Sequence, residues 1–107
     1  MSFGNRLLEV RKKRGLSQEI LAKELGTQGP AIGRYERGVA KPTIEVAGKL
    51  AKILEVSLDY LVGNTDLELD NETQKRILAV QQLSEKDKNN IFYTLDNLIK
   101  AAKLNAL

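Results

Sequence analysis

The sequence contains no cysteine and no histidine among its 107 residues. Without cysteine it has no disulfide, no thiolate metal ligand and no cysteine nucleophile. Without histidine it lacks the most common metal ligand and the usual general base at neutral pH. We therefore expect a protein that is not an enzyme and that uses neither a metal nor a cofactor.

Long apolar runs are missing as well. No stretch approaches the roughly 18 apolar residues that mark a membrane-spanning helix, and the N-terminus lacks the hydrophobic region of a signal peptide. Hydrophobic residues make up 42% of the chain and charged residues 29%, which is a globular composition. We expect a small cytoplasmic protein with no membrane partner.

Glycine and proline are absent from the C-terminal part of the chain. All eight glycines and both prolines precede residue 64. Charge changes at the same place, because residues 1–63 carry 11 basic and 7 acidic side chains whereas residues 64–107 carry 6 and 7. We expect a basic, turn-rich domain over residues 1–63, a short acidic linker over residues 64–70, and a helical segment over residues 71–107.

Helix start and stop signals recur along the chain, and no segment alternates with the period of two that is typical of a strand. All four serines lie at predicted helix N-caps, where a hydroxyl binds backbone N–H groups instead of acting as a nucleophile. Thr43 is expected to cap a helix whose inward stripe includes Ile44 and Leu50. The fold class is therefore predicted to be all-α. The expected helices cover about residues 2–14, 18–25, 30–37, 44–54, 58–62, 71–82 and 85–103.

A very short connection joins the second and third expected helices. The segment Gly26-Thr27-Gln28-Gly29 is too short for the two helices to pack side by side, so they must cross steeply, as in a helix-turn-helix. The surrounding sequence resembles the Cro/repressor (XRE) family of DNA-binding domains. The resemblance covers residues 3–63 and lies in three runs: Arg11-Lys12-Lys13-Arg14-Gly15-Leu16-Ser17-Gln18, Arg34-Tyr35-Glu36-Arg37-Gly38, and Val56-Ser57-Leu58-Asp59-Tyr60-Leu61.

This resemblance implies a five-helix, lambda-repressor-like domain whose third helix enters the major groove of double-stranded DNA. It implies that Gln18 contacts a phosphate and can also brace the first residues of the third helix. It also implies that Thr27 and Gln28 contact the backbone or the first base, and that Arg37 and Lys41 grip flanking phosphates. Tyr35 is expected to point inward, with a hydroxyl able to reach a phosphate. The groove face is assigned to the remaining positions: Gly29, Ala31, Gly33 and Arg34.

The groove face departs from the family pattern, because glycine and alanine cannot make bidentate contacts with bases. Arg34 is then the best candidate to read a guanine, and Gln28 the second. Gly33 either allows a close approach to DNA or is an ordinary helix glycine. Arg11 and Glu36 match a family ion pair between the first and third helices, which we interpret as structural. The basic run of residues 11–14 is either a solvated face or, through residues 12–14, a surface that attracts phosphates.

The last expected helix carries a broad apolar stripe with helical spacing. We expect this stripe to pair with the same helix of a second subunit, which would give a homodimeric repressor that binds a palindromic operator. Two alternatives stay open: the stripe packs on the N-terminal domain, or it binds a different protein, as in an antitoxin-like module. The stripe consists of Ile91, Phe92, Leu95, Leu98 and Ile99, with Ala102 at its end.

Overall fold

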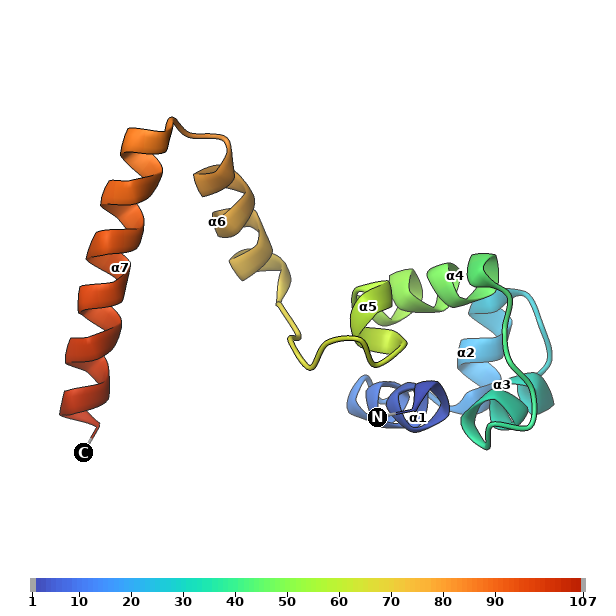
Figure 1. Cartoon of the computed structure of the whole chain (residues 1–107). Helices are drawn as coiled ribbons and strands as arrows, with labels where there is room; N and C mark the ends of the chain where they lie inside the picture. The colour runs from blue at the N-terminus through green and yellow to red at the C-terminus, as the bar shows by residue number, and fades with distance from the viewer. Residues whose placement is uncertain (1, 107) are drawn as a thin grey trace. The chain divides into compact units, whose positions relative to one another are not determined.

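The computed structural model describes residues 2–106, which form α-helices and no strand (Figure 1). The all-α prediction is confirmed. The helices are α1 (Phe3–Lys13), α2 (Gln18–Leu25), α3 (Gly29–Glu36), α4 (Ile44–Leu54), α5 (Leu58–Leu61), α6 (Asn71–Gln81) and α7 (Glu85–Asn105).

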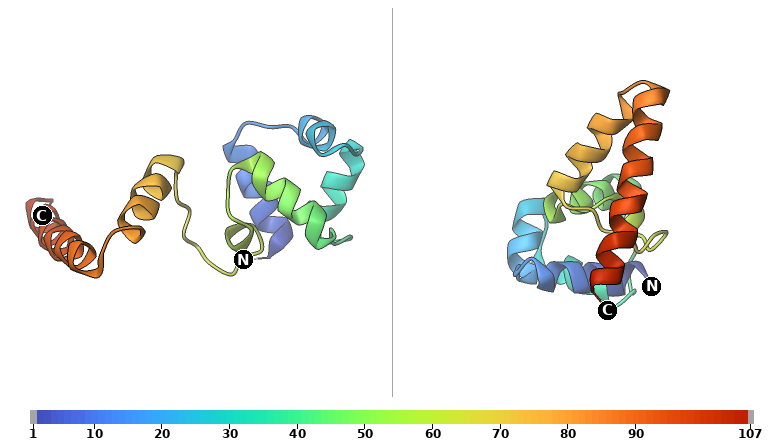
Figure 2. Two further views of the ribbon diagram at one scale, coloured as in Figure 1. Left: turned by 90° about the horizontal axis from the view of Figure 1, so that it is seen from above. Right: turned by 90° about the vertical axis from the view of Figure 1, so that its left-hand side faces the viewer.

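The chain divides into two compact units, residues 1–68 and residues 69–107, which we call the head and the tail. The head contains α1 to α5, packed around one another, and the tail contains α6 and α7, which run in opposite directions (Figure 2). None of the helices in residues 2–106 is both long enough and apolar enough to cross a membrane.

Most helices begin where a side chain can cap them. The Ser17 hydroxyl accepts a hydrogen bond from the Ile20 N–H at 3.0 Å, and the Thr43 hydroxyl accepts one from the Val46 N–H at 3.2 Å. The start of α3 differs from expectation: it begins at Gly29, one residue early, because Gln28 takes the extended N-cap conformation without a side-chain cap. Pro30 then lies in the first turn, where its missing N–H has no intrahelical partner to lose.

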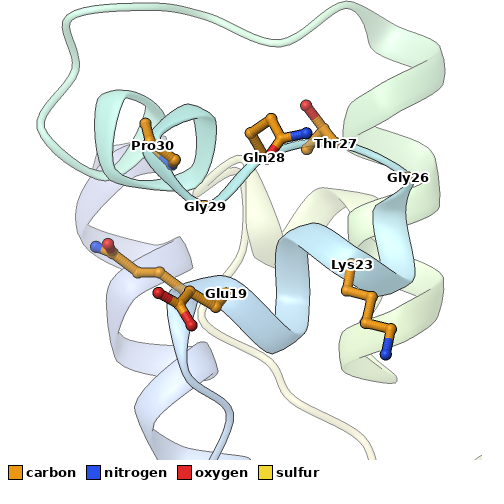
Figure 3. A pocket seen from close by; sticks show the side chains of 8 residues that line it. Glu19, Lys23, Gly26, Thr27, Gln28, Gly29 and Pro30 are labelled. Atoms are coloured by element: carbon orange, nitrogen blue, oxygen red, sulfur yellow. The ribbon is translucent and has the colours of Figure 1, made fainter.

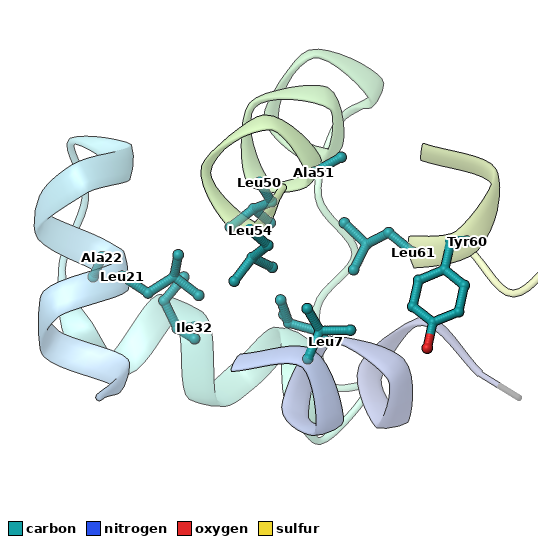
Figure 4. Packing of buried hydrophobic residues seen from close by; sticks show 10 residues of the cluster. Leu7, Leu21, Ala22, Ile32, Leu50, Ala51, Leu54, Tyr60 and Leu61 are labelled. Atoms are coloured by element: carbon teal, nitrogen blue, oxygen red, sulfur yellow. The ribbon is translucent and has the colours of Figure 1, made fainter. Parts of the chain in front are cut away.

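The core of the head joins all five of its helices through buried aliphatic side chains (Figure 4). Leu7 from α1, Leu21 from α2, Ile32 from α3, Leu50 from α4 and Leu61 from α5 are each 0% exposed. Burying a side chain of this size contributes about 1.5–3 kcal/mol, so this cluster fixes how the helices pack.

The inward stripe predicted for α4 is wrong at its first position. Ile44 is 72% exposed, whereas Leu50 is fully buried. Ile44 is the first residue of α4, immediately after the N-cap Thr43, and the stripe reaches the core only from Ala47 onward.

The N-terminus of α1 lies directly against the end of α3. A Cβ atom built on Gly4 would be 2.5 Å from the carbonyl oxygen of Glu36 and 2.7 Å from that of Tyr35. Real Cβ atoms do not approach backbone oxygens so closely, and here both neighbours belong to helix backbone that cannot rotate away. Only glycine allows this contact between the two helices.

Gly4→Ala is therefore expected to destabilise the head by about 1–3 kcal/mol, as overpacking of a rigid site does. The matched control is Gly48→Ala in the middle of α4, where an added Cβ meets nothing within 4 Å. That change should stabilise by about 0.5–1 kcal/mol, because alanine favours helix over glycine. Urea unfolding of both variants measures the difference, and equal effects of the same sign would contradict the close approach.

Most of the acidic stretch that was predicted to be a short linker over residues 64–70 belongs to the head. Its residues 64–68 lie in the first unit because two of its carboxylates bind α1. Asp66 pairs with Arg6 at 2.6 Å, and Glu68 pairs with Lys13 at 2.7 Å and with Arg14 at 3.0 Å. The hydrogen bond from Lys13 lowers the pKa of the Glu68 carboxyl below its usual value, helped by the Lys13 charge and then by the bond and charge of Arg14, and opposed by partial burial.

The tail has no buried residue in either of its helices. Its helices are nevertheless capped: the Asp70 carboxylate accepts a bond from the Thr73 N–H at 2.7 Å, and the Ser84 hydroxyl accepts one from the Asp87 N–H at 3.2 Å. The predicted start signals of α6 and α7 are thus confirmed, while their apolar side chains stay uncovered in the single chain.

Candidate nucleic-acid interface

The second and third helices form a helix-turn-helix that packs on the core of the head. Gly26 ends α2 in the left-handed conformation, with φ of +85°, which other residues rarely adopt. The Thr27 N–H then donates to the Ala22 carbonyl at 2.8 Å, which closes the turn. Because Leu21 and Ile32 are both fully buried, the steep crossing of α2 and α3 is fixed by packing as well as by the turn.

An open groove of about 760 Å³ runs along α2 and the turn to the start of α3 (Figure 3). Its walls are mostly polar, and the Glu19 side chain lies next to Gly29 at the beginning of α3. The residues lining it are Gln18, Glu19, Lys23, Gly26, Thr27, Gln28, Gly29 and Pro30.

The exposed residues of the head include the side chains with the strongest DNA-reading chemistry. Gln28 and Arg34 are both exposed, and neither makes a side-chain hydrogen bond or ion pair within residues 2–106. Thr27, Arg37 and Lys41 are exposed as well. An arginine or glutamine that is not held by the protein keeps its donors for a base edge or a phosphate.

A buried polar network ties this surface to α1. The Glu36 carboxylate accepts bonds from Arg11 at 2.5 Å and 3.1 Å and from the Gln18 amide at 2.9 Å. The Glu36 side chain is only 4% exposed, and Arg11 also donates to the Leu16 carbonyl at 2.9 Å. One carboxylate at the end of α3 thereby fixes α1, α2 and α3 together.

The sequence pattern of the helix-turn-helix family matches residues 7–61, which include every element of this arrangement. The chain belongs to the Cro/C1-type (XRE) helix-turn-helix family. This is a family of DNA-binding transcriptional regulators and not of enzymes.

Relatives of this XRE protein extend the similarity beyond the head. The transcriptional repressor RstR of the cryptic phage CTXphi in Vibrio cholerae is 31% identical over 92% of this chain and 88% of its own length. The P22 c2 repressor, solved with a synthetic operator, is 34% identical with a TM-score of 0.58, and the match covers 61% of this chain and 98% of that one. The SinR protein, solved as a complex with the SinI protein, is similar over 92% of this chain and 98% of that one, with 26% identity and a TM-score of 0.55.

The ion pair implied by the family resemblance is present in this XRE domain. Arg11 and Glu36 are bonded as expected, and both side chains are largely buried. Gln18 differs in its partner. Its amide donates to Glu36 at the end of α3 and so braces the last turn of that helix instead of the first residues.

Gly33 is covered by two side chains. A Cβ atom on Gly33 would lie 3.0 Å from Nη1 of Arg37 and 3.4 Å from Oε1 of Gln18, and the glycine is buried. Arg37 reaches this space because it follows Gly33 by one helical turn and helical side chains lean toward the N-terminus. The missing side chain therefore makes room for the guanidinium of Arg37, a role that spacing along the sequence does not reveal.

The other positions assigned to the groove face differ in solvent exposure. Gly29 and Ala31 are half-buried, while Arg34 is exposed. Tyr35 packs against the core and is also half-buried, as expected of an inward-pointing residue.

The basic residues 12–14 differ in whether they form ion pairs within the head. Lys13 and Arg14 are paired with Glu68, so much of their charge is matched within the head, whereas Lys12 is exposed and makes no ion pair within residues 2–106. No group of three or more acidic residues in the described part of the chain is arranged to hold a metal ion.

The predicted dimerisation residues form an exposed apolar face on α7. Ile91 is 37% exposed and Leu98 is 63% exposed, with the others between these values. A shallow hollow of about 390 Å³ lies on this face. The exposed stripe residues are Ile91, Phe92, Leu95, Leu98 and Ile99.

Proposed function

We propose that the protein is a dimeric transcriptional repressor that binds a palindromic operator by placing α3 in the major groove. The observation that carries the proposal is the two-sided character of α3. Ile32 and Glu36 anchor one side in the head. On the other side Arg34 is exposed and has no ion-pair partner among residues 2–106, on a helix-turn-helix of the XRE family.

The exposed side chains divide into those that read bases and those that hold the backbone. We assign Arg34 to a bidentate contact with guanine O6 and N7, and Gln28 to a second base contact. The methyl group of Ala31 packs on a thymine methyl. Contacts to phosphate do not read sequence but set the register of the protein on DNA. We assign them to Thr27, Gln18, Tyr35, Arg37 and Lys41.

Arg37 and Gln18 act together in this assignment. They lie side by side over Gly33, next to α3, so a single phosphate can accept from both. Gly33 adds no contact of its own, but its missing side chain leaves room for these two side chains.

The tail provides the second half of the proposal. Its apolar stripe is uncovered in the single chain, and its length suits a small bundle formed with the same helices of a second copy. A symmetric dimer presents two copies of α3 about one DNA turn, or roughly 34 Å, apart and therefore favours an inverted repeat. The repressor RstR, similar over most of its length, and the operator-bound P22 c2 repressor support repression by operator binding.

Selection of bound sites from a random duplex library tests this function. We expect an inverted repeat with half-sites about 10 base pairs apart, or a multiple of that spacing. If Arg37 and Lys41 neutralise four phosphates per dimer, log K should fall with log salt concentration with a slope of about −3.6 or steeper. Failure to enrich any sequence, or an affinity that does not change with salt, would contradict the proposal.

A second candidate function is a protein-interaction module whose tail binds another protein while the head binds DNA. The exposed face of α7 and the similarity to SinR, solved in complex with SinI, favour it. Light scattering of the purified protein separates the two candidates. A concentration-dependent dimer supports the repressor, and a monomer that co-purifies with another chain supports the interaction module.

A further inference from the structure

The head ends in a strap, residues 65–68, that is bonded along its length to α1. Near its start, the Arg6 guanidinium donates to the Thr65 carbonyl at 3.4 Å and to the Asp66 carboxylate at 2.6 Å. The guanidinium also lies over the Tyr60 ring, 3.9 Å from its centre, and the Arg6 side chain is only 4% exposed. Burial and the aromatic ring fix the arginine, while the Asp66 side chain that it binds is 94% exposed.

The other end of the strap is held by two cations at once. The Glu68 carboxylate accepts from Lys13 at 2.7 Å and from Arg14 at 3.0 Å, and its side chain is 21% exposed. Arg14 is itself held, because its Nε donates to the Leu54 carbonyl at the end of α4. The last residue of the strap is thereby connected to α1 and α4.

Hydrogen bonds to the tail begin at the next residue, Leu69. The Leu69 carbonyl accepts from the Gln74 amide at 3.2 Å, and Asp70 caps α6 through Thr73. Thr65, Asp66 and Glu68 are thus bonded to the head, Leu69 and Asp70 are bonded to α6, and Leu67 bonds only to Thr65 within the strap. While both carboxylates are paired, the unanchored part of the connection between head and tail is the short step from Glu68 to Leu69.

We propose that the strap sets the length of the tether between the DNA-reading head and the dimerising tail, and so decides which half-site spacings the dimer accepts. This inference rests on the proposed function, because it requires two heads joined through their tails. Asp66 and Glu68 are then specificity-determining residues that never touch DNA.

The change in reach is large on the scale of DNA. Releasing the four residues of the strap lengthens the tether by at most about 13–14 Å in each subunit, at roughly 3.3–3.6 Å per fully extended residue. One inserted base pair moves a half-site by only about 3.4 Å and turns it by about 35° around the helix axis. A dimer with released straps therefore reaches half-sites that a strapped dimer cannot occupy together.

The test compares the full-length protein with the variant Asp66→Asn/Glu68→Gln on operators obtained by selection. One, two or three base pairs are inserted between the half-sites. The unchanged protein should lose about tenfold or more in affinity with the first or second insertion, because two heads no longer bind at once. The variant should stay within about threefold of its own affinity for the uninserted operator.

The matched control is Glu72→Gln/Glu85→Gln, which also removes two carboxylates. Among the described residues, each of these pairs only with a lysine of its own helix, Lys75 at 3.7 Å and Lys88 at 3.5 Å. The control should keep the spacing profile of the unchanged protein. Amide order parameters of residues 65–68 should fall from about 0.85 toward about 0.6 in the strap variant only.

Each outcome of this experiment has a separate meaning. A variant that sediments as a dimer with a loosened strap, yet keeps the unchanged spacing profile, overturns the inference and leaves the proposed function intact. A strap that remains ordered without its two carboxylates also overturns it. A protein that sediments as a monomer and selects a single half-site overturns the proposed dimer first, and the inference with it.

Discussion

Replacing Arg34 by alanine should reduce affinity for the selected operator by between about 30-fold and about 10⁴-fold. A bidentate contact between arginine and guanine discriminates by about 1–3 kcal/mol, and a dimer loses two of them. Affinity for random DNA should change by less than about fivefold, because one phosphate-attracting charge per subunit is lost and no base contact contributes there. Fluorescence anisotropy with operator and scrambled duplexes at one salt concentration measures both.

Two further variants identify the kind of contact that Arg34 makes. Arg34→Lys keeps the charge but loses the planar fork, so it should restore little of the operator affinity if the contact is to a base. Lys41→Ala should weaken binding to all sequences alike. Equal losses on operator and scrambled DNA for Arg34→Ala, or full rescue by Arg34→Lys, would assign Arg34 to a phosphate instead.

Glu36→Ala should destabilise the head by about 3–5 kcal/mol, because it leaves the buried guanidinium of Arg11 without a counter-charge. It also removes the acceptor of the Gln18 amide, which braces α2 against α3. At about 4–8 °C per kcal/mol for a domain of this size, the melting temperature should fall by at least about 12 °C. The NMR signals of the buried Ile32 and Leu50 report the loss directly during thermal unfolding.

A double variant shows whether the unpaired charge is the cause. Arg11→Met/Glu36→Leu removes both charges and fills their volume, so it should recover most of the stability lost by Glu36→Ala. Glu45→Ala, an exposed carboxylate on α4, should change stability by less than about 0.5 kcal/mol. If the double variant is as unstable as Glu36→Ala, lost packing and not unpaired charge explains the effect.

The sequence predicts the features of this fold that act over one helical turn. Ser17, Thr43 and Ser84 cap helices as predicted, since a hydroxyl reaches backbone N–H groups only two or three residues ahead. The glycine at position 26 likewise marks the end of α2 through its own backbone conformation. Such signals are local, so they do not depend on tertiary contacts with the rest of the chain.

Contacts between distant residues were harder to predict. The pairs of Arg6 with Asp66 and of Lys13 with Glu68 join residues about 55–60 positions apart, and no periodicity encodes them. An acidic stretch beside a basic domain signals only that attraction is possible. The cover over Gly33 was missed for a different reason: it depends on the rotamers of Arg37 and Gln18, which follow from packing in three dimensions.

The pair between Arg11 and Glu36 is a long-range contact that was nevertheless predicted. Neither residue has a pattern that requires the other, and the pair was expected only through resemblance to a family. The structure supplies the physical reason: α1 crosses α3 so closely at Gly4 that a charge on α1 meets the end of α3.

Neither α6 nor α7 contains a buried residue, so in the proposed dimer the order of the tail would depend on the protein concentration. Two helices without a core of their own are only marginally stable in water, and covering the α7 stripe would stabilise them. When a second copy does so, the amount of paired protein falls with the square of the amount of dilute chain. If the total protein concentration is halved, about three quarters of the dimer is then lost. Operator occupancy therefore falls more steeply than the protein concentration.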